Sequence, residues 1–280
     1  MIYVPIIFEK ILNRFGLLGY LRTGYRLKIL NTSFKIPVIE NKEGLYYHQS
    51  ITERFLLSVL KSLYNQRDFL FIDVGVNFGQ TLLKLKAVKR NASYIGFEPS
   101  GLCAYYVSLL IGINKFSDAK VMRCALSNEV SILSLYAHSN GDARASIIKT
   151  DTEYEEIVPA FMIDSFIPII SEIQKEVILK VDVEGAEHLV FQGGENFLRE
   201  FNPVVIFENL PHGGDTSRKR QQLEISNFFL SRKYRLFLVE EPEGSLHGIN
   251  ILANEKDYRA TNYLAIPANM IGVLNDLCKV

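Results

Sequence analysis

A short, almost uninterrupted apolar run that carries one acid stands out in the pattern of hydrophobic and polar positions. Phe69–Val74 is apolar except for Asp73, as expected for a strand buried on both faces of a parallel sheet. Gly75 and Gly79 bracket the turn that follows, and apolar residues then recur at helical spacing through residues 80–89. The pattern therefore predicts a strand, a glycine turn and a helix.

Similar apolar runs recur along the chain. Residues 93–97 form a second run that stops at Glu98, which completes half of a nucleotide-binding unit. The polar stretch 138–148 predicts a loop over the active site, and 158–166 predicts an extended segment that enters a helix. The other predicted strands are 119–124, 131–136, 177–183, 203–207, 234–239 and 263–266, and the other predicted helices are 51–64, 100–113 and 217–232. Alternating strands and helices indicate an α/β fold with a mainly parallel sheet flanked by helices.

The first fifty residues predict an accessory segment ahead of a main domain at residues 51–280. Apolar side chains recur at helical spacing from Val4 to Leu18, which predicts an N-terminal helix. Residues 31–50 hold turn-forming residues and a short alternating stretch, which predict a hairpin.

The apolar face of the predicted N-terminal helix could also contact a membrane. Lys and Arg exceed Asp and Glu by about four in the first thirty residues, as in helices that lie on acidic surfaces. Two interpretations stay open: a helix packed on the main domain, or contact of residues 1–24 with a membrane or a partner enzyme. No stretch approaches the ~20 uncharged apolar residues that cross a bilayer.

Composition and charge narrow the class of protein. With 280 residues, of which 48% are hydrophobic, the chain is long enough for one large folded domain. Lys and Arg equal Asp and Glu at 31 each, so a nucleic-acid substrate lacks its usual electrostatic support. The three cysteines are widely spaced, which fits neither a disulfide framework nor a zinc site. A reducing, cytoplasmic setting is the simpler interpretation.

Acids follow or end several of the predicted strands. Because ligands bind outside the carboxyl ends of parallel strands, we expect Asp73, Glu98, Asp182 and Glu184 to gather along one edge of the sheet. Their mutual repulsion is unfavourable unless a cation lies among them. The candidates are the sulfonium and ammonium of S-adenosylmethionine, with a divalent metal as the alternative.

The glycine turn argues against a dinucleotide. Asn77 and Gln80 occupy positions where close contact with a pyrophosphate favours glycine. Asp73 at the end of the first strand would also repel a pyrophosphate, whereas it suits a cationic cofactor. A nicotinamide-dependent oxidoreductase is therefore the less favoured enzyme class.

Several motifs follow one another along the chain, at residues 71–80, 96–100, 124–127, 162–166, 179–187 and 205–208. Together they resemble the FkbM family of S-adenosylmethionine-dependent methyltransferases. The resemblance spans about residues 60–270 and implies a Rossmann-like class I methyltransferase fold, with a seven-stranded sheet whose last strand is antiparallel. It also implies methylation of an oxygen on a sugar, glycan or other small metabolite.

The resemblance implies a set of cofactor-binding residues. Asp73 and the glycine turn would hold the methionine portion, Glu98 the ribose and Leu126 the adenine, with Asp182 near the sulfonium. The full predicted set is Asp73, Gly75, Asn77, Gly79, Gln80, Glu98, Pro99, Ser100, Ala125, Leu126 and Asp182.

An alcohol acceptor must lose its proton as the new bond forms, which calls for a nearby base. The candidate catalytic residues are Asp182, Glu184, Glu208 and His212. No metal ligand is assigned. The loops at 137–157 and 210–220 are expected to select the acceptor. A methyltransferase-like module without catalytic activity is the non-enzymatic alternative.

Overall fold

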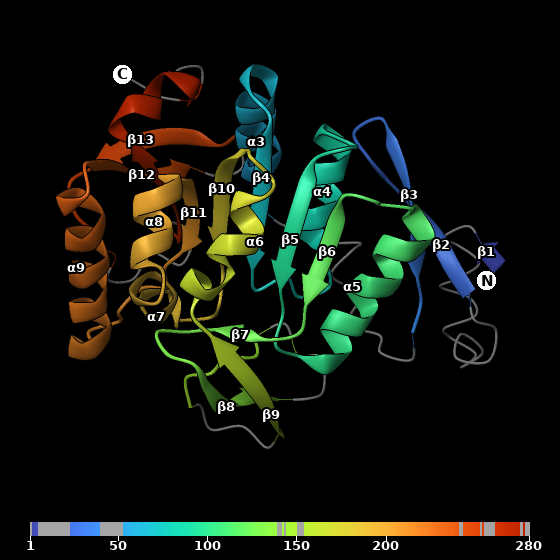
Figure 1. Ribbon diagram of the computed structural model, residues 1–280, viewed down its shortest axis with the longest axis horizontal. Coiled ribbons are helices and arrows are strands. Elements are labelled where there is room, and N and C mark those ends of the chain that lie inside the picture. Colours follow the sequence, from blue (N-terminus) through green and yellow to red (C-terminus); the bar gives the residue numbers. More distant parts are fainter. Residues whose placement is uncertain are drawn as a thin grey trace.

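The computed structural model describes residues 2–4, 23–39, 53–138, 142, 144–149, 154–240, 243–252, 254, 261–274 and 277. Its centre is an eight-stranded sheet with the order β13-β12-β14-β11-β10-β4-β5-β6 (Figure 1). The strands are β4 (Phe69–Val74), β5 (Ser93–Phe97), β6 (Ala119–Met122), β10 (Glu176–Val181), β11 (Val204–Glu208), β12 (Tyr234–Glu240), β13 (Ser245–Ile249) and β14 (Asn262–Pro267).

The five strands from β6 to β11 are parallel to one another. By contrast, β14 runs antiparallel to both of its neighbours, β11 and β12. The mainly parallel sheet predicted from the sequence is confirmed, and so is the antiparallel last strand that the family resemblance implied. The structure adds an eighth strand, β13, which pairs with β12 at the edge of the sheet. Its sequence, SLHGI, lacks the apolar run or the alternation that would produce a strand signal.

Helices cover both faces of the sheet. One hydrophobic cluster joins it to α3 (Phe55–Gln66), α4 (Gln80–Val88) and α5 (Gly101–Asn114). The second cluster joins it to four other helices of the described ranges, which are α6 (Ile167–Ser171), α7 (Glu187–Gln192), α8 (Glu195–Phe201) and α9 (Thr216–Ser231). Short 3-10 helices occur at Ile163–Phe166 and Ala268–Leu274. All six residues of β4 are buried, as their apolar pattern predicts.

The N-terminal hairpin lies earlier in the chain than expected. β2 (Thr23–Ile29) and β3 (Thr32–Pro37) pair antiparallel, and β1 (Ile2–Val4) pairs parallel with β2. The sequence places the hairpin within 31–50, of which residues 40–50 lie outside the described residues. Val4, the first position of the predicted helix, belongs to β1, and positions 5–22 also lie outside the described residues.

The hairpin packs on the main domain. The side-chain amide of Asn114 accepts a hydrogen bond from the backbone N–H of Lys35 at 2.8 Å and donates one to its carbonyl at 2.7 Å. The hydroxyl of Tyr106 donates to the Pro37 carbonyl. Because Tyr25, Phe34 and Ile36 belong to the same buried hydrophobic cluster as α3, α4 and α5, the hairpin shares the core of the larger domain.

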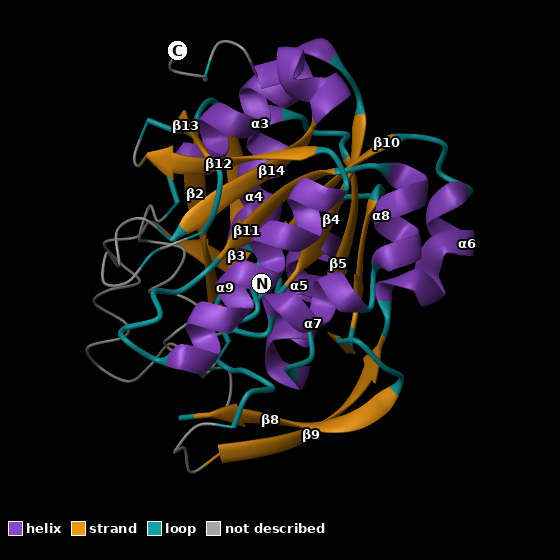
Figure 2. Ribbon diagram, turned by 90° about the vertical axis from the view of Figure 1, so that its left-hand side faces the viewer, coloured by secondary structure: helices purple, strands orange, loops and turns teal. Residues whose placement is uncertain are grey.

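A small second sheet lies beyond the carboxyl ends of the parallel strands (Figures 1 and 2). It has the order β7-β9-β8, formed by β7 (Ala125–Leu126), β9 (Tyr154–Phe161) and β8 (Ser131–Ala137). Tyr136 and Ser146 exchange backbone hydrogen bonds, so the polar segment after β8 folds back on this sheet. The sheet and this segment therefore stand at the edge where ligands bind in parallel α/β folds.

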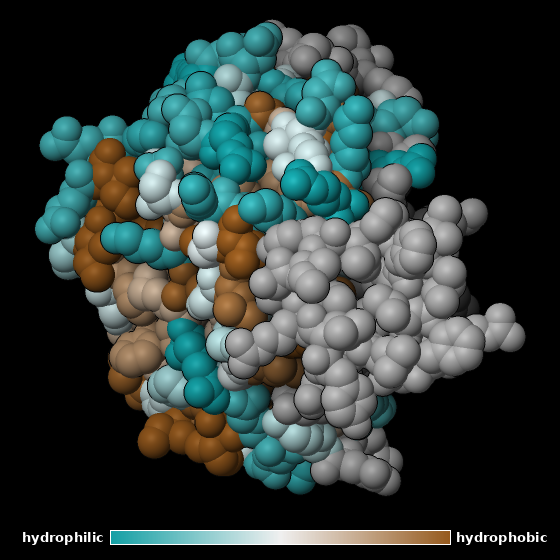
Figure 3. Space-filling model, turned by 90° about the vertical axis from the view of Figure 1, so that its right-hand side faces the viewer, coloured by the Kyte–Doolittle hydropathy of each residue, from teal (hydrophilic) through white to brown (hydrophobic). Residues whose placement is uncertain are grey.

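On the face seen in Figure 3, hydrophobic residues are interspersed with hydrophilic ones over the described part of the surface. No helix within the described ranges is long and apolar enough to span a bilayer.

Candidate active site

A cavity opens at the carboxyl ends of β4, β5 and β10. Most of the predicted cofactor-binding residues line it, and so do two of the candidate catalytic residues, Asp182 and Glu184. The lining residues that were predicted are Gly75, Asn77, Gln80, Glu98, Pro99, Ala125, Leu126, Asp182 and Glu184. The structure thus brings together three strand ends and the glycine turn, as the parallel topology requires.

The glycine turn packs directly against the end of β10. Gly75 has φ +87°, and a Cβ built there would lie 1.8 Å from the carbonyl oxygen of Asp182. The backbone N–H of Asp182 donates to the Val74 carbonyl at 2.9 Å, which holds the two strand ends together. Gly79, with φ +82°, does not line the cavity and precedes the first turn of α4. The turn therefore needs glycine at position 75 for space as well as for conformation.

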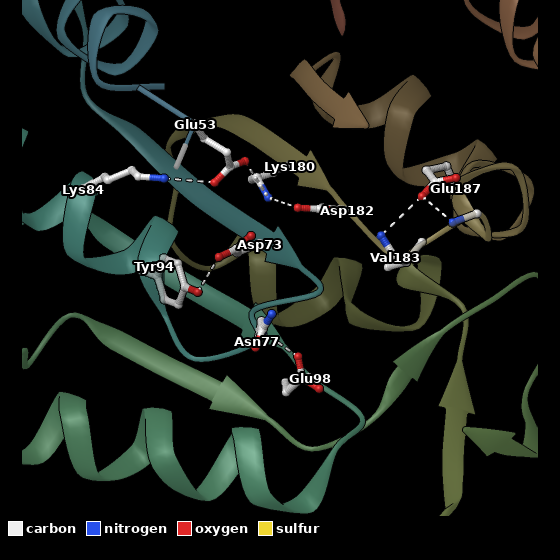
Figure 4. A network of polar contacts seen from close by, with 11 residues as sticks. Glu53, Asp73, Asn77, Lys84, Tyr94, Glu98, Lys180, Asp182, Val183 and Glu187 are labelled. Atoms are coloured by element: carbon white, nitrogen blue, oxygen red, sulfur yellow. Dashed lines mark hydrogen bonds and ion pairs between the residues drawn. The ribbon is translucent and has the colours of Figure 1, made fainter. Parts of the chain in front are cut away.

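Glu98 ties β5 to the glycine turn. One carboxylate oxygen accepts from the N–H of Asn77 at 2.7 Å (Figure 4), and the other accepts from the N–H of Ser100 at 2.8 Å. Burial raises the pKa of Glu98 to about 7, although both hydrogen bonds act to lower it. Ser100 acts here through its backbone, and its side chain does not line the cavity.

Asp73 lies behind the cavity wall. It is fully buried and does not line the cavity, in contrast to its expected position beside the methionine portion of the cofactor. The hydroxyl of Tyr94 donates to Oδ2 at 2.7 Å (Figure 4), while Oδ1 has no hydrogen-bond partner in the described part of the chain. Burial raises the pKa of Asp73 to about 7, opposed by Lys180 and Tyr94.

A row of alternating charges runs behind and into the cavity (Figure 4). The Lys84 ammonium lies 2.9 Å from one Glu53 oxygen, and the Lys180 ammonium lies 3.5 Å from the other. Lys180 also contacts Asp182 at 2.7 Å. Burial by itself raises the pKa of Glu53, but the two ammonium groups outweigh it and lower the pKa to about 2.

Glu53 and Lys180 line the cavity but were missed as site residues. The sequence signal for Lys180 is a lysine two residues before Asp182 in an otherwise apolar strand, which puts both side chains on one face. Glu53 has no such signal, because only the tertiary fold brings it to β10. The other unpredicted polar or sulfur-containing lining residues are Thr81, Cys103, Cys124, Asp142 and Ser146.

Three carboxylates meet where β10 and β11 end. Oxygens of Asp182, Glu184 and Glu208 lie within 4.8 Å of one another. Burial, reinforced by repulsion from the neighbouring acids, raises the pKa of Glu184 to about 7 and that of Glu208 to about 9. Glu208 does not line the cavity itself. The mutual repulsion of these acids favours a cation nearby, and a sulfonium or a metal ion would each reduce it.

The remaining catalytic candidate, His212, stands apart from the cavity. Its Nδ1 accepts from the backbone N–H of Gly214 at 3.1 Å in the loop after β11. The structure therefore does not bring His212 together with the three acids.

The segment after β8 forms a wall of the cavity, as predicted. Asp142 accepts backbone hydrogen bonds from His138 and Arg144, which shapes the segment. The hydroxyl of Ser146 donates to the carbonyl of Glu184 at 3.0 Å. Since Glu184 has φ +54°, this bond helps to hold a turn that few non-glycine residues adopt.

Comparison with known proteins identifies the family. A family model described as the methyltransferase FkbM domain matches residues 73–236, which is more than half of the chain. The chain belongs to the FkbM methyltransferase family. Methyltransferase sdnD of Sordaria araneosa is 25% identical over 191 residues, covering 58% of this chain and 74% of that protein.

Solved methyltransferase structures resemble this FkbM chain at low identity. The FkbM methyltransferase of Methylobacillus flagellatus gives a TM-score of 0.47 at 16% identity, covering 79% of this chain and 50% of that chain. The chain thus spans about half the length of that protein. An O-methyltransferase of Bacillus cereus, solved with S-adenosylhomocysteine, gives a TM-score of 0.42 at 14% identity over 81% of this chain and 89% of that one.

Membership of the FkbM family confirms the predicted family and its cofactor, S-adenosylmethionine, and removes support from the nicotinamide alternative. The residues present fit that cofactor. Acids with raised pKa values stand at the ends of β5, β10 and β11, where a positive charge would relieve their repulsion. Leu126 and Leu135 add an apolar wall to the same cavity.

The buried acids lead us to expect maximum stability at mildly acidic pH. Burial raises the pKa values of Asp73, Glu98 and Glu187 to about 7. Their contribution is fully present below the unfolded value of about 4 and is lost as pH rises through 7. Glu53, with its pKa of about 2, contributes stability that is lost as pH falls below about 4.

We therefore expect the Tm to be highest near about pH 5 and several degrees lower at about pH 8. Thermal unfolding followed by circular dichroism across this range measures it. A Tm that rises steadily from the acidic to the alkaline end would contradict the assignment of these carboxyls as protonated in the folded state.

Proposed function

We propose that this FkbM protein transfers a methyl group from S-adenosylmethionine to a hydroxyl oxygen of a sugar, glycan or other small metabolite. The observation that carries the proposal is the cavity itself, with Glu98 at the end of β5 and the acids Asp182 and Glu184 beyond the end of β10. These strands lie on either side of β4, so their ends stand roughly 10 Å apart.

That separation supports an extended binding mode along the edge of the sheet. Glu98 would accept hydrogen bonds from ribose hydroxyls, and Leu126 would pack on the adenine. Asp182 and Glu184 would then face the reacting end. The bound cofactor supplies an electrophilic methyl group on a positively charged sulfur. The protein's part is to align the acceptor oxygen with that methyl group and to receive the proton of the hydroxyl.

Glu184 is the candidate base that the geometry favours. It lines the cavity, and its pKa of about 7 suits proton transfer near neutral pH. Asp182 has one oxygen engaged by Lys180 at 2.7 Å. Glu208, with a pKa of about 9, holds its proton at neutral pH, and His212 lies outside the cavity.

Replacing Glu184 with glutamine is expected to lower kcat by about 10²–10⁴-fold, because the variant keeps the shape but loses the proton acceptor. Affinity for S-adenosylhomocysteine should stay nearly the same. Steady-state kinetics with the acceptor and calorimetry with the product separate the two quantities. A loss of affinity without a loss of kcat would make Glu184 a cofactor contact instead.

Replacing Glu98 with alanine is expected to weaken cofactor binding by about 1–3 kcal/mol, since ribose hydroxyls lose their partner and two backbone N–H groups become unsatisfied. Isothermal titration with S-adenosylhomocysteine measures this. As a control, Glu156→Ala removes a carboxylate that binds Gly101 and Arg123 outside the cavity, and it should leave affinity unchanged. Unchanged affinity in the Glu98 variant would remove the ribose assignment.

The proposal is tested first by titrating the purified chain with S-adenosylhomocysteine and, separately, with NAD. Binding of the first alone supports the cofactor and leads to a screen of nucleotide sugars, glycans and small alcohols, read by formation of S-adenosylhomocysteine. Binding of the cofactor without turnover of any acceptor class would favour a module without catalytic activity. Binding of NAD alone would overturn the proposal.

A further inference from the structure

The cavity contains a basic side chain, that of Lys180, to which no part of the cofactor has been assigned. Lys180 is the only basic residue among the described residues that line the cavity. It is 4% exposed, and its ammonium lies 2.7 Å from Asp182 and 3.5 Å from Glu53. A lysine ammonium has three donors, so these two contacts leave capacity for a further acceptor.

Glu53 reaches the same wall from a distant part of the sequence. It precedes α3 and lies outside residues 73–236, the part matched by the family model. Its φ of +47° is uncommon for a residue other than glycine. The contacts with Lys84 and Lys180 hold it in that conformation, and such backbone strain is found preferentially at functional sites.

Glu53, Lys180 and Asp182 line the cavity as a cation between two acids. That sequence of charges complements a zwitterion, in which a carboxylate and an ammonium are joined to one carbon atom. The first residues of α4, Gln80 and Thr81, line the cavity as well, and the N-terminus of a helix also favours a carboxylate. Glu98, the proposed ribose ligand, stands two strands away.

We propose that Glu53, Lys180 and Asp182 form the subsite for the α-amino-acid end of the cofactor. Lys180 binds the carboxylate, while Glu53 and Asp182 attract the ammonium and hold Lys180 in place. This inference rests on the proposed function. It replaces Asp73, which lies behind the wall, as the acid at this end of the cavity.

Two ligands that differ only in the amino-acid portion test the subsite. S-adenosylhomocysteine carries it, whereas 5′-methylthioadenosine keeps the adenine, ribose and thioether without it. By calorimetry, Lys180→Met should weaken binding of the first about 10–100-fold and of the second less than about 2-fold, as expected for loss of a charged hydrogen bond. Glu53→Gln, which preserves shape, should weaken only the first, by about 3–10-fold.

Lys175→Met is the control variant. It removes the ion pair with Asp68 at 2.8 Å, and neither of these residues lines the cavity. The ratio of the two affinities should therefore equal that of the wild-type protein, even if stability falls.

Each outcome decides whether these charged residues bind the cofactor or only stabilise the fold. Selective loss of S-adenosylhomocysteine binding supports the subsite, whereas equal loss of both ligands, or no loss, overturns it. If Lys180→Met does not fold, Glu53→Gln decides in the same way. Wild-type protein that binds neither ligand would overturn the proposed function together with the subsite, so the two failures are distinct.

Discussion

Replacing Gly75 with alanine is expected to destabilise the protein by about 3 kcal/mol or more and to abolish binding of S-adenosylhomocysteine. Two effects add. The backbone has φ +87°, which strains any residue with a Cβ, and the new Cβ would lie 1.8 Å from the Asp182 carbonyl oxygen. Because that oxygen belongs to the backbone, relief requires β4 and β10 to separate, and their separation disrupts the cavity between them.

Gly185→Ala is the matched control for this substitution. Gly185 also has positive φ, at +100°, but no described atom lies within 4 Å of a Cβ built there. Only the backbone strain applies, about 1–2 kcal/mol. Urea unfolding of both variants gives the two free energies. If they are equally destabilised, strain alone accounts for Gly75, and the close approach of the strands is not the cause.

Replacing Lys180 with methionine is expected to lower the free energy of unfolding by about 3–5 kcal/mol at neutral pH. Lys180 is nearly fully buried between Glu53 and Asp182, and removing it leaves these carboxylates without their shared cation. Lys180 helps to lower the pKa of Glu53 to about 2, so the loss of this ion pair matters less once Glu53 is protonated. The difference from wild type should therefore shrink as pH falls below about 4.

Urea unfolding at several pH values measures this difference. The double variant Lys180→Met with Glu53→Gln completes a thermodynamic cycle, because it also removes one of the two carboxylates that contact Lys180. We expect it to recover part of the loss, with a coupling energy of about 0.5–3 kcal/mol. Strict additivity of the two substitutions, or a loss that does not depend on pH, would show that packing and not charge accounts for the role of Lys180.

The hydrophobic pattern of the sequence was sufficient to predict the main architecture. The apolar run of β4, the glycine turn and the run of β5 have local signals, because a strand buried on both faces must be apolar and a left-handed turn favours glycine. The position of the candidate site followed as well, since parallel strands bring their carboxyl ends to one edge. Edge strand β13, which is half polar, carried no comparable signal.

The sequence by itself determined which acids stand at the strand ends, and the family motifs that contain them. Only the tertiary structure decided which of these acids face the cavity. Asp73 lies behind the cavity wall, where it accepts a hydrogen bond from Tyr94. Glu208 lies close to Asp182 because β11 is next to β10 in the sheet. Glu53 joins the site from residues before α3, through ion pairs with two lysines. Such contacts depend on strand order and on residues far apart in the chain, and local periodicity contains no information about either.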